Sequence, residues 1–188
     1  MGLLLNRKAL VAALGLMAAG TAQADTFSAD INDDAFKFEY KATNSSSNLD
    51  FNASALVHDD DGEIYAVGAQ VEGQSLQQSN IKGALGGKLY YINLEGDANG
   101  TAIGLGGSIQ IGIPQVQALA IQLEGYYAPQ VLSFNDIEHN TDIGIKALYR
   151  ILDNGSVYLG YRKANVDIED VGDGDLDEGF HIGMQLDL

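Results

Sequence analysis

The sequence predicts an all-β fold: an antiparallel transmembrane β-barrel of eight to ten strands, with ten favoured, preceded by a cleaved signal peptide. Three observations lead to this prediction. Apolar and polar residues alternate with a period of two after the first 24 residues, the alternating segments are nine to twelve residues long, and the chain begins with an export leader. A period of two is typical of β-strands, and no window has the period of 3.6 that a helix needs. Segments of this length match tilted strands that cross a bilayer.

The leader has the three parts of a secretory signal peptide. Arg7 and Lys8 supply the basic region, residues 9–19 the apolar run, and Ala22-Gln23-Ala24 a small-x-small cleavage site. The run is too short to cross a hydrocarbon core of ~30 Å as a helix. We therefore expect residues 1–24 to be removed after export through the Sec pathway. Residues 25–188 then form a single barrel domain in the outer membrane of a gram-negative bacterium.

Composition excludes several classes of protein. The chain has no cysteine, so it has no disulfide, no thiolate metal site and no lipid anchor through cysteine. Without the leader, eight basic residues stand against 26 acidic ones, a net charge of −18. We expect no nucleic-acid partner, because phosphate binding needs a basic surface. No segment after the leader approaches the length of about eighteen apolar residues that marks a transmembrane helix.

The alternation can be followed segment by segment. Residues 156–166 form one such segment, and the apolar positions of the others are, in chain order, Phe36, Phe38, Tyr40, Phe51, Ala53, Ala55, Val57, Tyr65, Val67, Ala69, Val71, Leu85, Leu89, Tyr91, Ile103, Leu105, Ile109, Ile111, Leu119, Ile121, Leu123, Tyr127, Ile143, Ile145, Tyr149, Ile151, Phe180, Ile182, Met184, Leu186 and Leu188. Most of the positions between them are small, polar or charged. Each segment therefore has one apolar and one polar face.

The connections are predicted to alternate in length. Three short ones are nearly uncharged: residues 43–47, 112–117 and 152–155. Four others are mostly acidic and include the longest: residues 59–62, 93–100, 129–139 and 167–178. Tight periplasmic turns, longer outer loops and an even strand number are typical of outer-membrane barrels. The count is ten if residues 26–31 form an opening strand, and eight if they are only a lead-in.

Charge placement indicates which face points inward. A soluble sandwich buries its apolar face, whereas a membrane barrel turns that face to lipid. The polar face carries seven basic and six acidic residues: Lys37, Lys41, Lys82, Lys88, Lys146, Arg150, Arg162, Glu39, Asp50, Glu72, Glu124, Asp142 and Asp187. A nearly neutral set of ions fits a narrow, packed lumen, because unpaired buried ions are costly. We name as lumen charges Lys82, Lys88, Glu124, Asp142, Lys146, Arg150 and Arg162.

The C-terminus ends on a further pattern. His181, Gly183, Leu186 and Leu188 resemble the signal that delivers outer-membrane barrels to their assembly machinery. That signal usually ends on an aromatic residue, where this chain has Leu188.

The chain as a whole resembles the YfaZ family of outer-membrane proteins. The segments that carry the resemblance are Asn32–Tyr40, His58–Glu63, Gly86–Tyr91, Glu124–Pro129, Tyr158–Lys163 and Gly179–Met184. The resemblance covers nearly the whole mature chain and implies an outer-membrane location. It implies no established activity and supplies no site residues.

The candidates for catalysis and metal binding are few. His139 has Ser133, Asp136 and Glu138 nearby, but such groupings arise by chance in an acidic loop, so we expect no catalytic or cofactor-binding residue. Asp173, Asp175 and Asp177 are weak candidates for Ca²⁺ or Mg²⁺. They do not form an EF-hand, because counting from Asp173 the turn-glycine position holds Glu178.

The sequence therefore predicts a small outer-membrane barrel with a packed, charge-paired lumen, acidic outer loops and no catalysis, in a structural or surface-interaction role. Its expected partners are outer-membrane lipid, lipopolysaccharide and the barrel assembly machinery, and the oligomeric state stays open. Three alternatives remain: a narrow channel for small solutes, an outer-membrane enzyme acting on lipid or peptide, and a soluble periplasmic β-protein.

Overall fold

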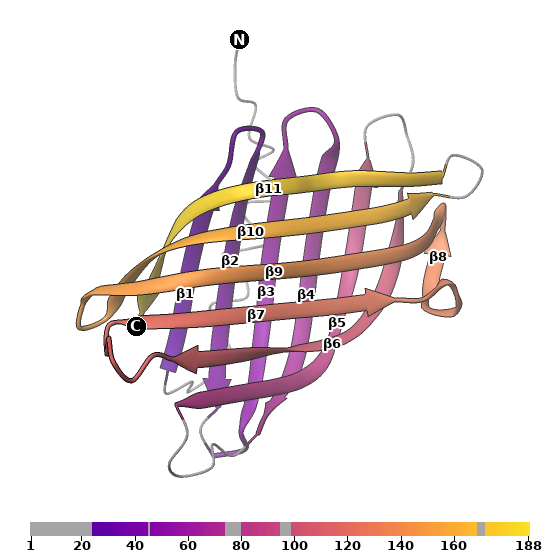
Figure 1. Ribbon diagram of the computed structural model, residues 1–188. Helices are drawn as coiled ribbons and strands as arrows, with labels where there is room; N and C mark the ends of the chain where they lie inside the picture. The colour runs from indigo at the N-terminus through magenta and orange to yellow at the C-terminus, as the bar shows by residue number, and fades with distance from the viewer. Residues whose placement is uncertain (1–23, 45, 74–79, 95–98, 169–171) are drawn as a thin grey trace.

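The computed structural model describes residues 24–44, 46–73, 80–94, 99–168 and 172–188. Apart from Ala24, the expected signal peptide lies outside the described residues. The described chain is all-β and forms a closed antiparallel barrel of ten long strands (Figure 1), which confirms the predicted fold class and the favoured strand count. No helix in the described part of the chain is long and apolar enough to cross a membrane.

The barrel strands are β1 (Ala24–Ile31), β2 (Ala35–Asn44), β3 (Leu49–His58), β4 (Gly62–Glu72), β5 (Ile81–Leu94), β6 (Asn99–Gly112), β7 (Leu119–Ala128), β9 (Ile137–Leu152), β10 (Gly155–Ile168) and β11 (Gly172–Asp187). A 3-10 helix, η2 (Gln130–Leu132), and the three-residue strand β8 (Ser133–Asn135) lie between β7 and β9. Each barrel strand pairs with the strands before and after it in the chain, so the connections are simple hairpins.

The barrel closes where the first strand pairs with the last. Thr26 lies opposite Asp187 and Ile31 lies opposite Ile182, in antiparallel register. The predicted opening strand is therefore present as β1. We call the end of the barrel where β1 begins and β11 ends the terminal end, and the opposite end, which carries the β1–β2, β3–β4, β5–β6, β7–β9 and β10–β11 connections, the loop end. Ala24, the first described residue, and the C-terminus both lie at the terminal end, as an even strand number requires.

The predicted alternation of short and long connections is wrong. The acidic segment 167–178 is mostly strand, because Asp167 pairs with Asp173 and Ile168 with Gly172. Segment 93–100 is likewise shortened, since β5 runs to Leu94 and β6 begins at Asn99. Gly and Asp have low strand propensity, but pairing with a neighbouring strand satisfies the backbone hydrogen bonds and overrides that propensity.

The apolar face of the strands points out of the barrel. Large apolar side chains are exposed around the whole wall, including Phe38, Phe51, Val67, Leu85, Leu105, Leu123, Ile145, Leu159 and Ile182. Soluble monomers rarely expose contiguous apolar surface of this extent. The outer wall therefore matches a lipid-facing belt, and the small and polar residues of the same strands fill the interior.

Candidate functional site

Much of the interior near the loop end is apolar. We call this part the apolar layer, and it consists of Leu56, Ile64, Ile92, Ala102, Ala128, Ile137, Val166 and Leu176. Each of these residues is at most 7% exposed. They come from β3, β4, β5, β6, β7, β9, β10 and β11, so apolar side chains meet across the barrel from most of its wall. The expectation of a polar lumen thus holds for only part of its length.

A first group of charges lies in the middle of the barrel, on β5, β7 and β9. Lys88 donates to Glu124 at 2.7 Å, and its Nζ lies 3.8 Å from an Asp142 carboxylate oxygen. The ammonium also lies 4.2 Å from the centre of the Tyr126 ring. Tyr90 donates its hydroxyl to Asp142 at 3.2 Å. We call Lys88, Glu124, Asp142, Tyr90 and Tyr126 the central cluster, in which one buried ammonium neutralises two carboxylates in part.

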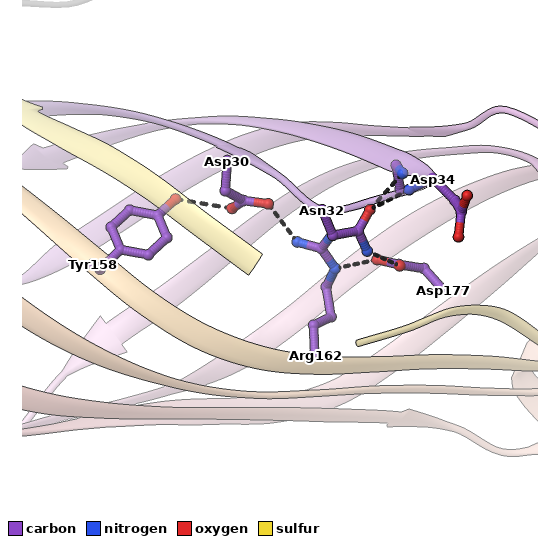
Figure 2. Close-up of polar contacts among 7 residues, drawn as sticks. Asp30, Asn32, Asp34, Tyr158, Arg162 and Asp177 are labelled. Atoms are coloured by element: carbon purple, nitrogen blue, oxygen red, sulfur yellow. Dashed lines mark hydrogen bonds and ion pairs between the residues drawn. The ribbon is translucent and has the colours of Figure 1, made fainter. Parts of the chain in front are cut away.

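A second group joins the first strand to the last two (Figure 2). Arg162 on β10 donates from Nη1 to Asp30 on β1 at 2.7 Å and from Nε to Asp177 on β11 at 2.5 Å. Tyr158 donates its hydroxyl to Asp30 at 2.8 Å. Asn32 donates its amide to Asp177 at 2.6 Å. We call these five residues the seam cluster, because they span the β1–β11 pairing that closes the barrel.

The seam cluster is held by its local backbone. Asn32 lies in the β1–β2 turn, and its side-chain oxygen accepts the backbone N–H groups of Asp34, at 3.1 Å, and Ala35, at 2.5 Å. This turn points the Asn32 amide back toward Asp177 (Figure 2). On β10, Tyr158 lies opposite Gly183 of β11, and a Cβ at Gly183 would collide with the Tyr158 ring. A glycine is therefore needed opposite this large inward-facing ring.

His181 occupies the interior between these groups. Its ring packs edge-on against Tyr158, with centroids 6.0 Å apart, and its position opposite Gly160 leaves room for the imidazole. Neither ring nitrogen has a hydrogen-bond partner among the described residues. A small cavity beside it, lined by Lys37, Gln122, Glu124, Asp142, Gly144, Lys146, Arg162 and His181, has room for about one water molecule. The interior is therefore packed and polar at this level.

The seven named lumen charges are not equivalent. Lys88, Glu124, Asp142 and Arg162 lie inside the barrel in the contacts described above. Lys146 also faces inward, but its Nζ lies over the Tyr158 ring at 4.9 Å rather than against a carboxylate. Lys82 and Arg150 share the polar face, yet both are exposed at the terminal end and are not buried lumen charges. Both residues lie near the ends of their strands, where the lumen meets solvent. Alternation therefore predicts the face on which a residue lies but not whether its side chain is buried.

Sequence reasoning missed the acidic half of the seam cluster. Asp30 and Asp177 are both buried, although neither was predicted to face inward and Asp177 was placed in an acidic connection. The signal for Asp30 was present, because it alternates with Ala29 and Ile31 on the strand that begins the barrel. Asp177 likewise shares the parity of His181 on β11.

The predicted metal-binding carboxylates do not all lie within the described part of the chain. The Asp177 carboxylate is engaged by Arg162 and Asn32, and the side chains of Asp173 and Asp175 lie outside the described residues. Among the residues that the structure describes, no group of three or more His, Asp or Glu side chains is placed to hold a metal ion.

His139 lies beside Asp167, with 3.6 Å between Nδ1 and Oδ2, and stacks on Tyr127 at a centroid distance of 6.1 Å. Ser133 instead donates its hydroxyl to the Pro129 carbonyl oxygen, and Asp136 accepts the Asn99 N–H. The loop residues that sequence reasoning grouped around His139 therefore have other partners.

A closed antiparallel barrel of ten strands, apolar outside and ion-paired inside, is a β-barrel of the outer-membrane type. The sequence profile of a family described as YfaZ precursor matches residues 6–188, and the chain belongs to this family. The family resemblance inferred from the sequence is thus confirmed. No curated protein matches the chain.

Solved structures show a distant likeness. The outer membrane channel DcaP of Acinetobacter baumannii has a TM-score of 0.46 and 11% identity over 86% of this chain. This chain spans 54% of that channel's length. A chain solved in work on the in-meso crystallization of membrane proteins has a TM-score of 0.46 and 10% identity over 88% of this chain and 83% of its own. Neither likeness is close enough to carry an argument about function.

Proposed function

We propose that this protein is a small outer-membrane barrel with a closed lumen, and that it has a structural or surface-interaction role without catalysis. The observation that carries the proposal is the filled interior, which holds the apolar layer, the central cluster and the seam cluster. Two cavities lie beside these side chains in the part of the chain that the structure describes, and each has room for about one water molecule. A packed interior suits a barrel that presents its surface rather than passing solutes.

The proposed location follows from the outer wall and the ends of the barrel. The apolar belt faces lipid, the terminal end faces the periplasm, and the loop end, with exposed Asp33, Asp34, Asp59, Asp60 and Asp61, faces outward. The same proposal includes export through the Sec pathway and removal of residues 1–24. It also includes recognition of the C-terminal strand by the assembly machinery, through His181, Gly183, Leu186 and Leu188. At the loop end, we expect the acidic residues to bind divalent cations, which also bridge anionic lipopolysaccharide.

Localisation tests this proposal directly. We expect the protein to fractionate with outer membranes and to migrate differently on gels before and after heating, because a closed barrel resists unfolding until it is heated. Immunoblots of separated membrane and periplasmic fractions provide the measurement. Recovery of the folded protein mainly in the soluble periplasmic fraction would contradict the membrane location.

The second candidate function is a narrow channel, which the polar side chains of the terminal half favour. We nevertheless expect no steady conductance from the purified protein in planar lipid bilayers, because apolar constrictions exclude water and ions. A protein of known conductance, inserted under the same conditions, controls for failed insertion. Large ion-selective steps from the wild-type protein would replace the structural role with that of a porin.

A further inference from the structure

The exposure of the inward-facing side chains changes along a single strand. On the inward face of β7, Gln122 is half-buried, the Glu124 side chain is 14% exposed, Tyr126 is 2% exposed and Ala128 is fully buried. On the inward face of β9, Lys146 is half-buried and Ile137 lies in the apolar layer, but Leu148, nearer the terminal end, is 5% exposed. Exposure therefore falls from the terminal end toward the loop end along β7, and from Lys146 onward along β9.

The side chains at the more exposed level are hydrophilic. Gln122 and Lys146 line the cavity beside His181, and Ser156 and Gln185 are half-buried inward residues of β10 and β11 near the terminal end. Hydroxyl, amide and ammonium groups hydrogen-bond water and small ions well. In the apolar layer Ile92, Ala102 and Ala128 have no exposed surface, and the Asn140 amide, which lies opposite Ala128 and Val166, is buried at 1% exposure.

We infer that the lumen is a one-sided recess. Water and small hydrophilic ions enter it from the terminal end as far as Gln122 and Lys146, and the apolar layer separates them from the loop end. An apolar constriction is a barrier because a hydrated ion would lose its water there without gaining polar partners. The inference rests on the proposed function, since it requires the barrel to span a membrane with its two ends in different compartments.

Thiol labelling tests the inference, because the chain has no cysteine of its own. Single cysteines replace residues of β7: Gln122→Cys in the recess, Ala128→Cys in the apolar layer and Leu123→Cys on the outer wall. Asp60→Cys at the loop end and Asn154→Cys in the β9–β10 turn report which end of the barrel faces the outside of a lipid vesicle. The probe is a small charged methanethiosulfonate added outside, and heat-dependent gel migration checks that each variant is folded.

In vesicles whose barrel orientation exposes Asn154→Cys to the added probe, we expect Gln122→Cys to be labelled as well. In vesicles of the opposite orientation, where the probe reaches only Asp60→Cys, we expect Gln122→Cys to be protected. Ala128→Cys is expected to stay unlabelled from both sides, because a thiol reacts only where the reagent has access. Labelling of Ala128→Cys from the loop end, or protection of Gln122→Cys from the terminal end, would overturn the one-sided recess.

The outer-wall variant separates this inference from the proposed function. Leu123→Cys faces lipid if the barrel spans the membrane, and we then expect it to resist the charged probe. Labelling of Leu123→Cys as fast as Asp60→Cys would contradict the membrane location itself. Protection of Leu123→Cys together with labelling of Ala128→Cys would leave the membrane location intact and refute the recess alone.

Discussion

Arg162→Met is expected to lower the free energy of unfolding by about 3–5 kcal/mol, because it leaves two buried carboxylates without their cation. The Arg162 side chain is 4% exposed, and those of Asp30 and Asp177 are each 2% exposed. Methionine keeps much of the length and apolar volume of the arginine stem, so the loss of stability reports mainly the removal of the charge. Urea unfolding of the barrel reconstituted in lipid vesicles provides the measurement.

The neighbouring residue gives a matched control. Lys163 pairs with Glu178 at 2.7 Å on the outer face, and the two side chains are 40% and 37% exposed. Lys163→Met is therefore expected to cost only about 0–1 kcal/mol. Adding Asp30→Asn and Asp177→Asn to Arg162→Met is expected to restore part of the lost stability, since neutral amides need no counterion. Equal losses for Arg162→Met and Lys163→Met would refute the structural role of the seam cluster.

Leu123→Arg is expected to destabilise the folded barrel by about 2–4 kcal/mol in a lipid bilayer, because it places a charge on the lipid-facing wall. Leu123 is 42% exposed in the middle of β7 and lies opposite Ile109 and Ile145 on the two neighbouring strands. An arginine there has no polar partner in the hydrocarbon. The fraction of folded barrel in lipid vesicles, measured across a urea series, gives the free-energy difference.

A control at another depth makes this prediction specific. Thr141 lies on the same outer face of β9, nearer the loop end and opposite Tyr127. Thr141→Arg is expected to cost only about 0–1 kcal/mol, since an interfacial arginine can reach water. If Leu123→Arg folds in lipid as stably as Thr141→Arg, the assignment of the apolar face to lipid is wrong.

The strands and their faces could be predicted because they depend on local alternation. Phe38 and Lys37, or Leu123 and Gln122, are adjacent in sequence, and a strand sends adjacent side chains to opposite faces. Most of the large apolar residues predicted for the apolar face are therefore exposed on the outer wall. Loop lengths could not be predicted in the same way, because the acidic segment at Asp167 became strand only through pairing with β11.

The charge contacts depend on strands far apart in the chain. Arg162 is 132 residues from Asp30, yet the closure of β1 on β11 brings them within hydrogen-bond distance. Alternation identified Arg162 as an inward cation but could not choose among the available carboxylates. It also could not tell that Lys146 would meet an aromatic ring instead. Assignment to the inward face therefore did not identify the partner of each charge.

The all-β class, the face on which each strand residue lies, the apolar character of the outer face and the family could all be inferred from the sequence, because they are encoded in patterns local to one strand or one segment. The closure of the barrel, the pairing of Arg162 with Asp30 and Asp177, and the separation of the interior into an apolar layer and a charged middle are seen only in the folded barrel. These features require the depth and register of every strand relative to the others. Barrel closure sets that register, since it fixes which residues of distant strands share one level of the lumen.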